Sequence, residues 1–368
     1  MEFIPLASPN ISSSDIERVL EVLTSGMLVF SKNGLEAEGK LANITQVSHA
    51  KLTSNGTSTM HIALKTLGIG PGDEVIIPAL SYVATANVVE MVGATPVFVD
   101  INLDSFNIDV SQIEAAITVN TKAIIPVHEF GHPAEMDDIM AIADKHNLKV
   151  VEDAACALGA KINGKSVGTY GDFGSFSFHP RKSITSGEGG ALIFNDHSYL
   201  NSVDAFRNHG INIVDGEMDF VEPGFNYRLT DIQAALLVGQ LDKLNKNIEY
   251  RDELAKFYNS ELTNKVKKPS TQKDKFKRSW QSYHIVLESN EQRNELLKHL
   301  KNEQIQTNYG AQCIPDLTFY KKKYKFVSET LFPSAYKAYK CGLVLPLYEK
   351  LNKKHILYIS EKINSFLK

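Results

Sequence analysis

The stretch "DEVIIPALSYVATANVVEMVGATPVFVDI", residues 73–101, has the pattern of a strand, a helix and a second strand. Its two apolar runs are rich in Val and Ile, and a helix-like segment separates them. Similar apolar runs recur further along the chain, at residues 122–130, 148–155, 173–178 and 190–194. Runs that are apolar on both faces are typical of a largely parallel sheet covered by helices on each side. We therefore expect an α/β protein whose functional residues follow the carboxyl ends of the strands.

The chain is long enough for two domains. Its 368 residues, with 43% hydrophobic and 22% charged content, are typical of a globular protein. From residue 231 to 262 the sequence predicts one long amphipathic helix that links two domains. We expect a large domain over residues 21–240 and a linking helix with a smaller α+β domain over 241–368. Residues 1–20 are expected to form an N-terminal segment that packs on the smaller domain.

Composition excludes several classes of protein. A net charge of −4 and a pI near 6.3 favour no nucleic-acid partner, and "YKKKYK" at 320–325 is typical of a solvated face. The sequence shows no secretory leader and no apolar run of the roughly 18 residues that a membrane span needs. We expect a cytoplasmic protein. Cys156, Cys313 and Cys341 are far apart and odd in number, which favours reduced thiols over disulfides or a metal site.

One lysine lies in an unusual setting. In "SFSFHPRKSITSGEGG", residues 175–190, Lys182 follows a strand-like run and precedes a glycine-rich turn. A catalytic lysine needs a carbonyl partner, which pyridoxal 5'-phosphate supplies through a Schiff base. That cofactor also needs a carboxylate for its pyridinium nitrogen. Asp153, at the end of the run "KVVED", is the candidate, although the same residue could instead cap a following helix.

The cofactor's phosphate and ring also need partners. Gly56, Thr57 and Ser58 open a predicted helix directly after a strand, where backbone amides favour an anion; taken alone they are only a good helix start. Ser177 lies five residues before Lys182 and could add its hydroxyl. Tyr82 follows the strand "VIIP" and could stack on the ring, although a single aromatic residue there is also typical of a core.

Five successive motifs resemble those of a known family: "SNGTSTMHIAL", "IPALSYVATAN", "VVEDAACALGA", "GTYGDFGSFSFHPRKSITSGEGG" and "PGFNYRLTDIQAAL". The family is the DegT-type sugar-nucleotide aminotransferases, within the fold-type I, aspartate-aminotransferase-like pyridoxal-phosphate enzymes. The resemblance implies that fold, pyridoxal phosphate as cofactor, and transamination of a nucleotide-linked keto-sugar with L-glutamate. It also implies a homodimer with composite active sites.

The resemblance assigns roles to individual residues. Lys182 corresponds to the lysine that holds the cofactor and moves the proton, and its presence in place of histidine disfavours dehydration. By the same resemblance, Asp153 corresponds to the partner of the pyridinium nitrogen and Tyr82 to the aromatic residue that stacks on the ring. The phosphate ligands correspond to Thr57, Ser58 and Ser177, and Asn226 to a phosphate ligand from the neighbouring subunit. Cys156 stands where relatives often carry glutamine. Because a thiol is a weak donor, we expect an altered contact with the cofactor's ring hydroxyl.

Several alternatives stay open at this level. The short "KSITSGEGG" favours amination at carbon 4 of a 4-keto-6-deoxy sugar, for a surface glycan such as a lipopolysaccharide O-antigen, over a 3-aminotransferase. A nicotinamide oxidoreductase would need GxGxxG after a strand, whereas "LGIGPGDE" precedes one. A non-catalytic sensor of the same fold is excluded only by activity.

Overall fold

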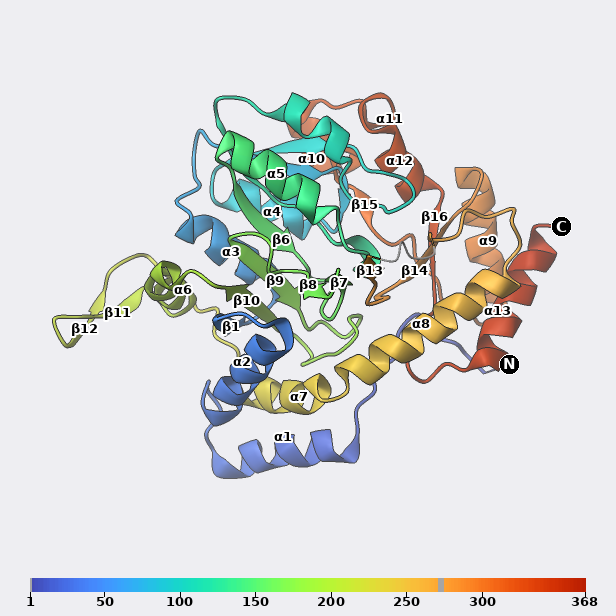
Figure 1. Cartoon of the computed structure of the whole chain (residues 1–368). Coiled ribbons are helices and arrows are strands. Elements are labelled where there is room, and N and C mark those ends of the chain that lie inside the picture. The colour runs from blue at the N-terminus through green and yellow to red at the C-terminus, as the bar shows by residue number, and fades with distance from the viewer. Residues whose placement is uncertain (1, 271–274) are drawn as a thin grey trace.

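A seven-stranded sheet forms the centre of the computed structural model, which describes residues 2–270 and 275–368 (Figure 1). The strand order is β1-β10-β9-β6-β5-β2-β4. Neighbouring strands from β9 to β4 run parallel, and β10 runs antiparallel to both of its neighbours. The expected α/β class with a mostly parallel sheet is confirmed. The strands are β1 (His49–Thr53), β2 (Glu74–Pro78), β4 (Thr95–Val99), β5 (Thr121–Ile124), β6 (Lys149–Asp153), β9 (Phe173–Ser177) and β10 (Gly190–Phe194).

Helices cover both faces of this sheet. Because successive side chains of a strand point to opposite faces, each strand contributes to two apolar cores, one on each face. In β2, the side chains of Val75 and Ile77 belong to one buried cluster and that of Ile76 to the other. The first cluster includes residues of α3 (Gly56–Thr66), α4 (Ala84–Met91) and α6 (Leu200–Arg207). The second includes residues of α2 (Lys32–Thr45), α5 (Met136–His146) and α7 (Asp231–Leu241). The unit β2-α4-β4 therefore forms as its sequence predicts.

A smaller α+β part follows α8 (Leu244–Glu261) and has a separate apolar core. Its two-stranded sheet pairs β14 (Tyr283–Val286) with β16 (Gly342–Leu345), and α9 (Asn290–Asn302) and α13 (Lys353–Phe366) pack around it. The remaining helices and strands here are α10 (Thr318–Tyr324), α11 (Ser328–Leu331), α12 (Pro333–Lys340), β13 (Phe276–Lys277) and β15 (Gln312–Cys313).

Short elements connect the two parts. β15 pairs with β3 (Leu80–Ser81), and β13 pairs with β7 (Lys161–Ile162), which also pairs with β8 (Lys165–Ser166).

Single turns of 3₁₀ helix lie at Val110–Gln112, Glu114–Ala116, Glu129–Gly131, His197–Tyr199 and Ile314–Asp316. Within the described part of the chain, every helix is too short or too polar to cross a membrane.

The expected long linking helix is wrong in one respect, because it is divided into α7 and α8. Asp242 and Lys243 form a turn between the two helices, and the N–H of Lys243 donates to Gln240 O, three residues back, at 3.1 Å. The Lys243 side chain donates to Ser12 Oγ at 2.7 Å and to the Asp15 carboxylate at 2.5 Å. No glycine or proline marks this break, and residues of the N-terminal segment stabilise it instead.

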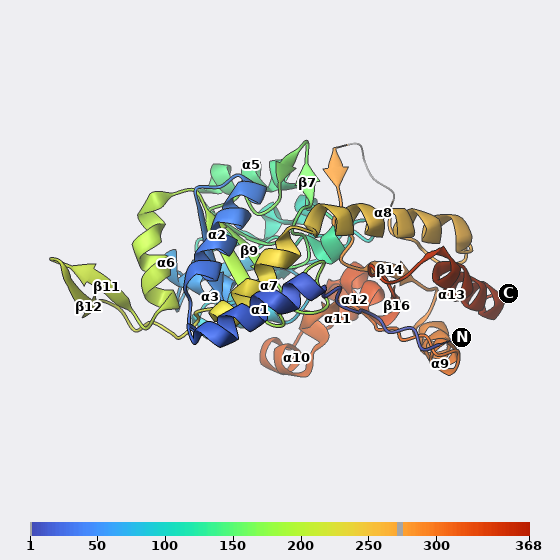
Figure 2. The ribbon, with the colours of Figure 1, turned by 90° about the horizontal axis from the view of Figure 1, so that it is seen from below.

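The N-terminal segment contacts both parts of the chain, whereas the sequence predicted packing on the smaller part alone. Ile4 pairs with Ile305 of the smaller part. The helix α1 (Ser13–Ser25) instead packs along α7, as Figure 2 shows. Buried Asp15 accepts a hydrogen bond from Gln240 Nε2 at 3.0 Å, and this polar contact fixes α1 on the larger part.

A hairpin projects from the molecule beyond α6 (Figures 1 and 2). It consists of β11 (Ile211–Val214) and β12 (Glu217–Phe220). The turn residues Asp215 and Gly216 both have positive φ, as a two-residue hairpin turn requires. Large apolar side chains remain exposed along this hairpin, namely Ile213, Val214, Met218 and Phe220.

Candidate active site

The predicted functional residues gather at one edge of the central sheet. Asp153 ends β6 and Ser177 ends β9, and the register of these parallel strands places Asp153 opposite Ser175. The turn from β1 into α3 lies at the same edge, since Gly56 O accepts a hydrogen bond from Ser175 Oγ at 3.3 Å. Lys182 follows β9 by five residues. The carboxyl ends of parallel strands therefore place an acid, a hydroxyl and a lysine together.

Asp153 is buried, with 5% of its surface exposed, and has only neutral hydrogen-bond donors. Its Oδ2 accepts from Thr85 Oγ1 at 2.8 Å, and Thr85 in turn contacts Ser81 Oγ at 2.9 Å. Its Oδ1 accepts from the N–H of Ala155 at 3.2 Å. No ion pair to this carboxylate occurs among the residues described. The helix-cap alternative is wrong, because residues 154–160 form turns rather than a helix.

Lys182 lies between sulfur and acid groups. Its Nζ donates to Cys156 Sγ at 3.1 Å. Burial acts to lower the pKa of Lys182, but Cys156, Asp153 and Glu129 more than offset burial and leave that pKa raised. Burial raises the pKa of the Cys156 thiol. This raised pKa keeps the Lys182 nitrogen protonated near neutral pH in the described chain.

The start of α3 offers free backbone donors. Asn55 caps the helix by accepting from the N–H of Ser58 at 2.8 Å, and Ser58 Oγ donates to Asn55 O at 2.7 Å. Within the described ranges, the N–H groups of Gly56 and Thr57 have no hydrogen-bond acceptor. A helix N-terminus with two free amides is a site for an anion such as phosphate. The hydroxyl of Ser58 is already used in the cap.

Close packing places Ser177 directly behind this helix start. A methyl group added at Gly56 would lie 3.0 Å from Ser177 Cβ, so a larger residue would displace the strand end. At Gly190 of β10, an added methyl would lie 2.5 Å from the backbone of Asn55. Ser177 Oγ has one long contact, 3.5 Å from the N–H of His179. Its hydroxyl is therefore available beside the amides of Gly56 and Thr57.

Two further predicted residues are exposed. Tyr82 has 67% of its surface exposed, so the alternative of a core aromatic is wrong. Asn226 is exposed, and its side chain has no hydrogen-bond partner in the described part of its own chain. Its neighbour Tyr227 accepts a hydrogen bond from the N–H of Ser54 at 2.8 Å, which places this segment beside the start of α3.

Two residues near Asp153 were not predicted from the sequence. Thr85 orients the Asp153 carboxylate, and its only signal was its place in the segment after a strand. Glu129 is buried at the end of the segment that follows β5, and its charge interacts with Asp153 and Lys182. The sequence "PVHEF" was interpreted as part of an apolar strand, so the acid inside it was overlooked.

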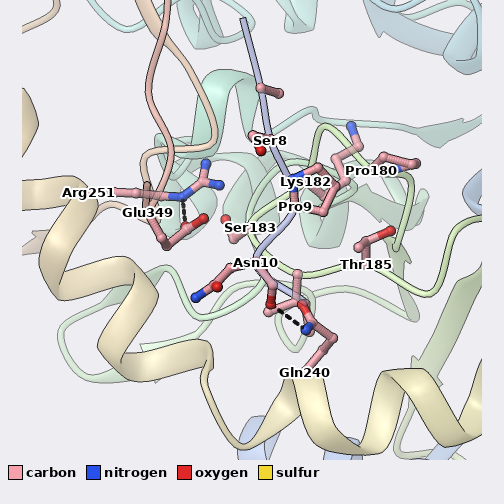
Figure 3. Close-up of a pocket in the computed structure, with 12 residues that line it drawn as sticks. Ser8, Pro9, Asn10, Pro180, Lys182, Ser183, Thr185, Gln240, Arg251 and Glu349 are labelled. Atoms are coloured by element: carbon pink, nitrogen blue, oxygen red, sulfur yellow. Dashed lines mark hydrogen bonds and ion pairs between the residues drawn. The ribbon is translucent and has the colours of Figure 1, made fainter. Parts of the chain in front are cut away.

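A small pocket is lined in part by Lys182 and its loop (Figure 3). Residues of the N-terminal segment, Ser8 to Asn10, form one wall, and an ion pair between Arg251 and Glu349 at 2.5 Å forms another. Of the predicted cluster, Lys182 lines this pocket, whereas Asp153 and Ser177 do not. In the residues described, no group of His, Cys, Asp or Glu side chains could hold a metal ion.

This donor set fits pyridoxal phosphate. The cofactor has a cationic ring nitrogen, an aldehyde and a phosphate, and the site offers a carboxylate lacking a cation, a lysine and an anion-binding helix start. The fold and the site therefore define the class of pyridoxal-phosphate enzymes built on a mostly parallel sheet. The oxidoreductase alternative finds no support in this arrangement.

Comparison with known proteins agrees with this class. The model of the DegT/DnrJ/EryC1/StrS aminotransferase family matches residues 9–364. GDP-perosamine synthase of Escherichia coli O157:H7 is 36% identical over 100% of this chain and 99% of its own, and that of Caulobacter vibrioides is 41% identical over 72% of each. The pyridoxal-phosphate form of a putative sugar aminotransferase of Streptococcus pneumoniae, Spr1654, superimposes with a TM-score of 0.94 at 31% identity, covering 99% and 98% of the two chains.

The chain belongs to the DegT/DnrJ/EryC1/StrS aminotransferase family. It is a pyridoxal-phosphate-dependent sugar aminotransferase.

Proposed function

We propose that the protein transfers an amino group from L-glutamate to carbon 4 of a nucleotide-linked 4-keto-6-deoxy sugar. The observation that carries this proposal is Lys182, held beside Asp153 at the edge of the sheet where the amides of Gly56 and Thr57 are free. The names of the two GDP-perosamine synthases support guanosine diphosphate as the nucleotide. The amino sugar would then enter a surface glycan such as a lipopolysaccharide O-antigen.

Each residue has a defined part in this reaction. The cofactor, when bound, supplies a ring that accepts electrons as a C–H bond next to nitrogen breaks. Asp153 holds the ring nitrogen protonated, and Thr85 keeps its carboxylate oriented. Lys182 holds the cofactor and then takes and returns the proton. Exposed Tyr82 covers one ring face, and Gly56, Thr57 and Ser177 bind the phosphate. Cys156 lies beside the Lys182 nitrogen.

A substrate screen tests the proposal. The purified protein is incubated with glutamate and with 4-keto-6-deoxy sugars linked to guanosine, thymidine or uridine diphosphate, and products are read by mass. We expect amination of the guanosine-linked sugar and none with Lys182→Ala. Matched 3-keto sugars test the position of amination, and aspartate or alanine in place of glutamate tests the donor. Amination of the 3-keto sugars alone would overturn the carbon 4 assignment.

We further propose that the active unit is a homodimer with shared sites in the cytoplasm. Exposed apolar side chains line one face of α1, namely Ile16, Leu20 and Leu23, Met27 lies exposed just after this helix, and others line the β11-β12 hairpin. Contiguous apolar surface of this kind favours contact with another protein surface. Asn226 follows the hairpin; its backbone pairs with Asn208, but its exposed side chain has no hydrogen-bond partner in the described part of its own chain, as is expected of a ligand donated to a second copy. Three free cysteines fit a reducing compartment.

A further inference from the structure

Glu129 is an acidic residue inside the active site with no role in the reaction described so far. It begins the 3₁₀ turn Glu129–Gly131 after β5, and 5% of its surface is exposed. The preceding residue, His128, donates its backbone N–H to Asp153 O at 3.1 Å, so this turn is paired with the end of β6. Glu129 therefore follows β5, which is the neighbour of β6 in the sheet, and lies at the same carboxyl edge of the sheet as Asp153.

The turn is held in a conformation that tertiary contacts must stabilise. Phe130 has a φ of 54°, which is unfavourable for a bulky residue. Its ring is buried and stacks on His284, with ring centroids 4.5 Å apart. The N–H of Glu129 donates to Asn107 Oδ1 at 2.8 Å. Phe130 is therefore fixed in the core, whereas the carboxyl group of the preceding Glu129 interacts with charged groups of the site.

The carboxyl group of Glu129 interacts electrostatically with three groups of the site. Its charge interacts with Asp153 of β6, with Cys156 in the turn after β6, and with Lys182 after β9. Burial and the neighbouring Asp153 raise the pKa of Glu129 to about 8, although Lys182 and the N–H of Phe130 act in the opposite direction. No other side chain in the described residues forms a hydrogen bond with it. Near neutral pH, Glu129 is therefore a buried neutral acid with a proton to donate.

We propose that Glu129 positions the cofactor by donating a hydrogen bond from its neutral carboxyl group to the ring oxygen next to the carbon that Lys182 binds. That oxygen carries negative charge and lies between the positions of the pyridinium nitrogen and the lysine nitrogen. Cys156 lies beside Lys182, but a thiol is a weak donor. A carboxyl donor withdraws charge from this oxygen and so favours loss of the proton from the Lys182 nitrogen in the loaded enzyme.

The test is a pH titration of the visible absorbance of the resting holoenzyme, which reports the pKa of the Lys182 nitrogen without turnover. Glu129→Gln keeps a neutral donor of similar size, and we expect the wild-type pKa. Glu129→Leu removes the donor, and we expect that pKa to rise by about one unit, a tenfold change in the acid constant. Glu188→Gln removes an exposed carboxylate near Lys182 in the sequence, and we expect no shift. Thermal unfolding of each variant checks the fold.

Two results would overturn the proposal. If Glu129→Gln and Glu129→Leu both lower the pKa, the side chain acts as a carboxylate that stabilises the protonated nitrogen. If neither changes the pKa, Glu129 has no contact with the cofactor. Loss of the pH-dependent visible absorbance in Lys182→Ala is independent of both results, so failure here leaves the cofactor and the aminotransferase reaction standing.

Discussion

At the scale of single residues, the charge of Asp153 is the feature on which the site depends. Its two hydrogen bonds come from a hydroxyl and an amide, neither of which neutralises a carboxylate. A buried carboxylate is tolerated when a cation pairs with it, and the ring nitrogen of the cofactor is such a cation. In the function proposed above, the ring nitrogen of the bound cofactor would be the partner that Asp153 lacks in its own chain.

We predict that Asp153→Asn keeps the fold and loses most activity. Without the charge, the ring nitrogen is no longer held protonated, and an electrostatic partner of this kind contributes about 3 kcal/mol to the transition state, or a hundredfold or more in kcat. Steady-state kinetics measures the loss, and absorbance checks that the cofactor still binds. The matched control is Thr85→Val, which removes only the orienting hydroxyl and should cost less. A near-normal kcat in Asp153→Asn would refute the pairing.

At the scale of the element, β6 places two acids on opposite faces of the sheet. Asp153 faces the cofactor site, whereas Glu152, one residue earlier, is directed to the other face. Glu152 accepts hydrogen bonds from the backbone N–H groups of Gly168, Tyr170 and Gly171, at 2.6 to 2.9 Å. One strand thus supplies both a chemical group and the anchor of the loop that precedes β9.

We expect Glu152→Gln to destabilise the protein by about 3 kcal/mol, because an amide NH₂ would face several backbone donors in a buried site. His128 Nε2, 2.9 Å from the Glu152 carboxylate, would lose its partner as well. Urea unfolding followed by circular dichroism measures the change. An exposed acid provides the control, since Glu329→Gln should leave stability within about 0.5 kcal/mol. Equal stability of the two variants would show that the loop is anchored elsewhere.

At the scale of the whole molecule, the apolar hairpin and the exposed face of α1 lead to a prediction about shared sites. In a symmetric dimer, a Lys182→Ala chain combined with an Asn226→Ala chain forms one pocket that has both native residues. We expect each single variant to be impaired and the mixture to regain part of the activity after subunit exchange. Size-exclusion chromatography establishes the oligomeric state beforehand. If mixing restores nothing, Asn226 serves its own chain.

Sequence patterns predicted those parts of the structure that depend on residues close together in the chain. The periodicity of residues 73–101 is local, because each strand and helix presents its apolar side chains at fixed spacing, and β2, α4 and β4 follow from it. Parallel strands share one carboxyl edge, so the positions of Asp153, Ser177 and Lys182 after their strands were enough to bring them together.

Contacts between distant segments decided the rest. The break between α7 and α8 is stabilised by Lys243 and Asp15, which are 228 residues apart. Glu129 lies in a turn whose next residue, Phe130, stacks on His284 in another part of the chain, and its carboxyl group interacts with Asp153 and Lys182. From the sequence pattern alone, Lys243 lies within a predicted helix and Glu129 within a predicted strand, so the local pattern indicates neither feature. The sequence by itself therefore determined the sheet and the placement of Asp153 and Lys182 at its carboxyl edge. Only the tertiary structure determined the break between α7 and α8 and the burial of Glu129, because burial and charge depend on neighbours that folding brings together.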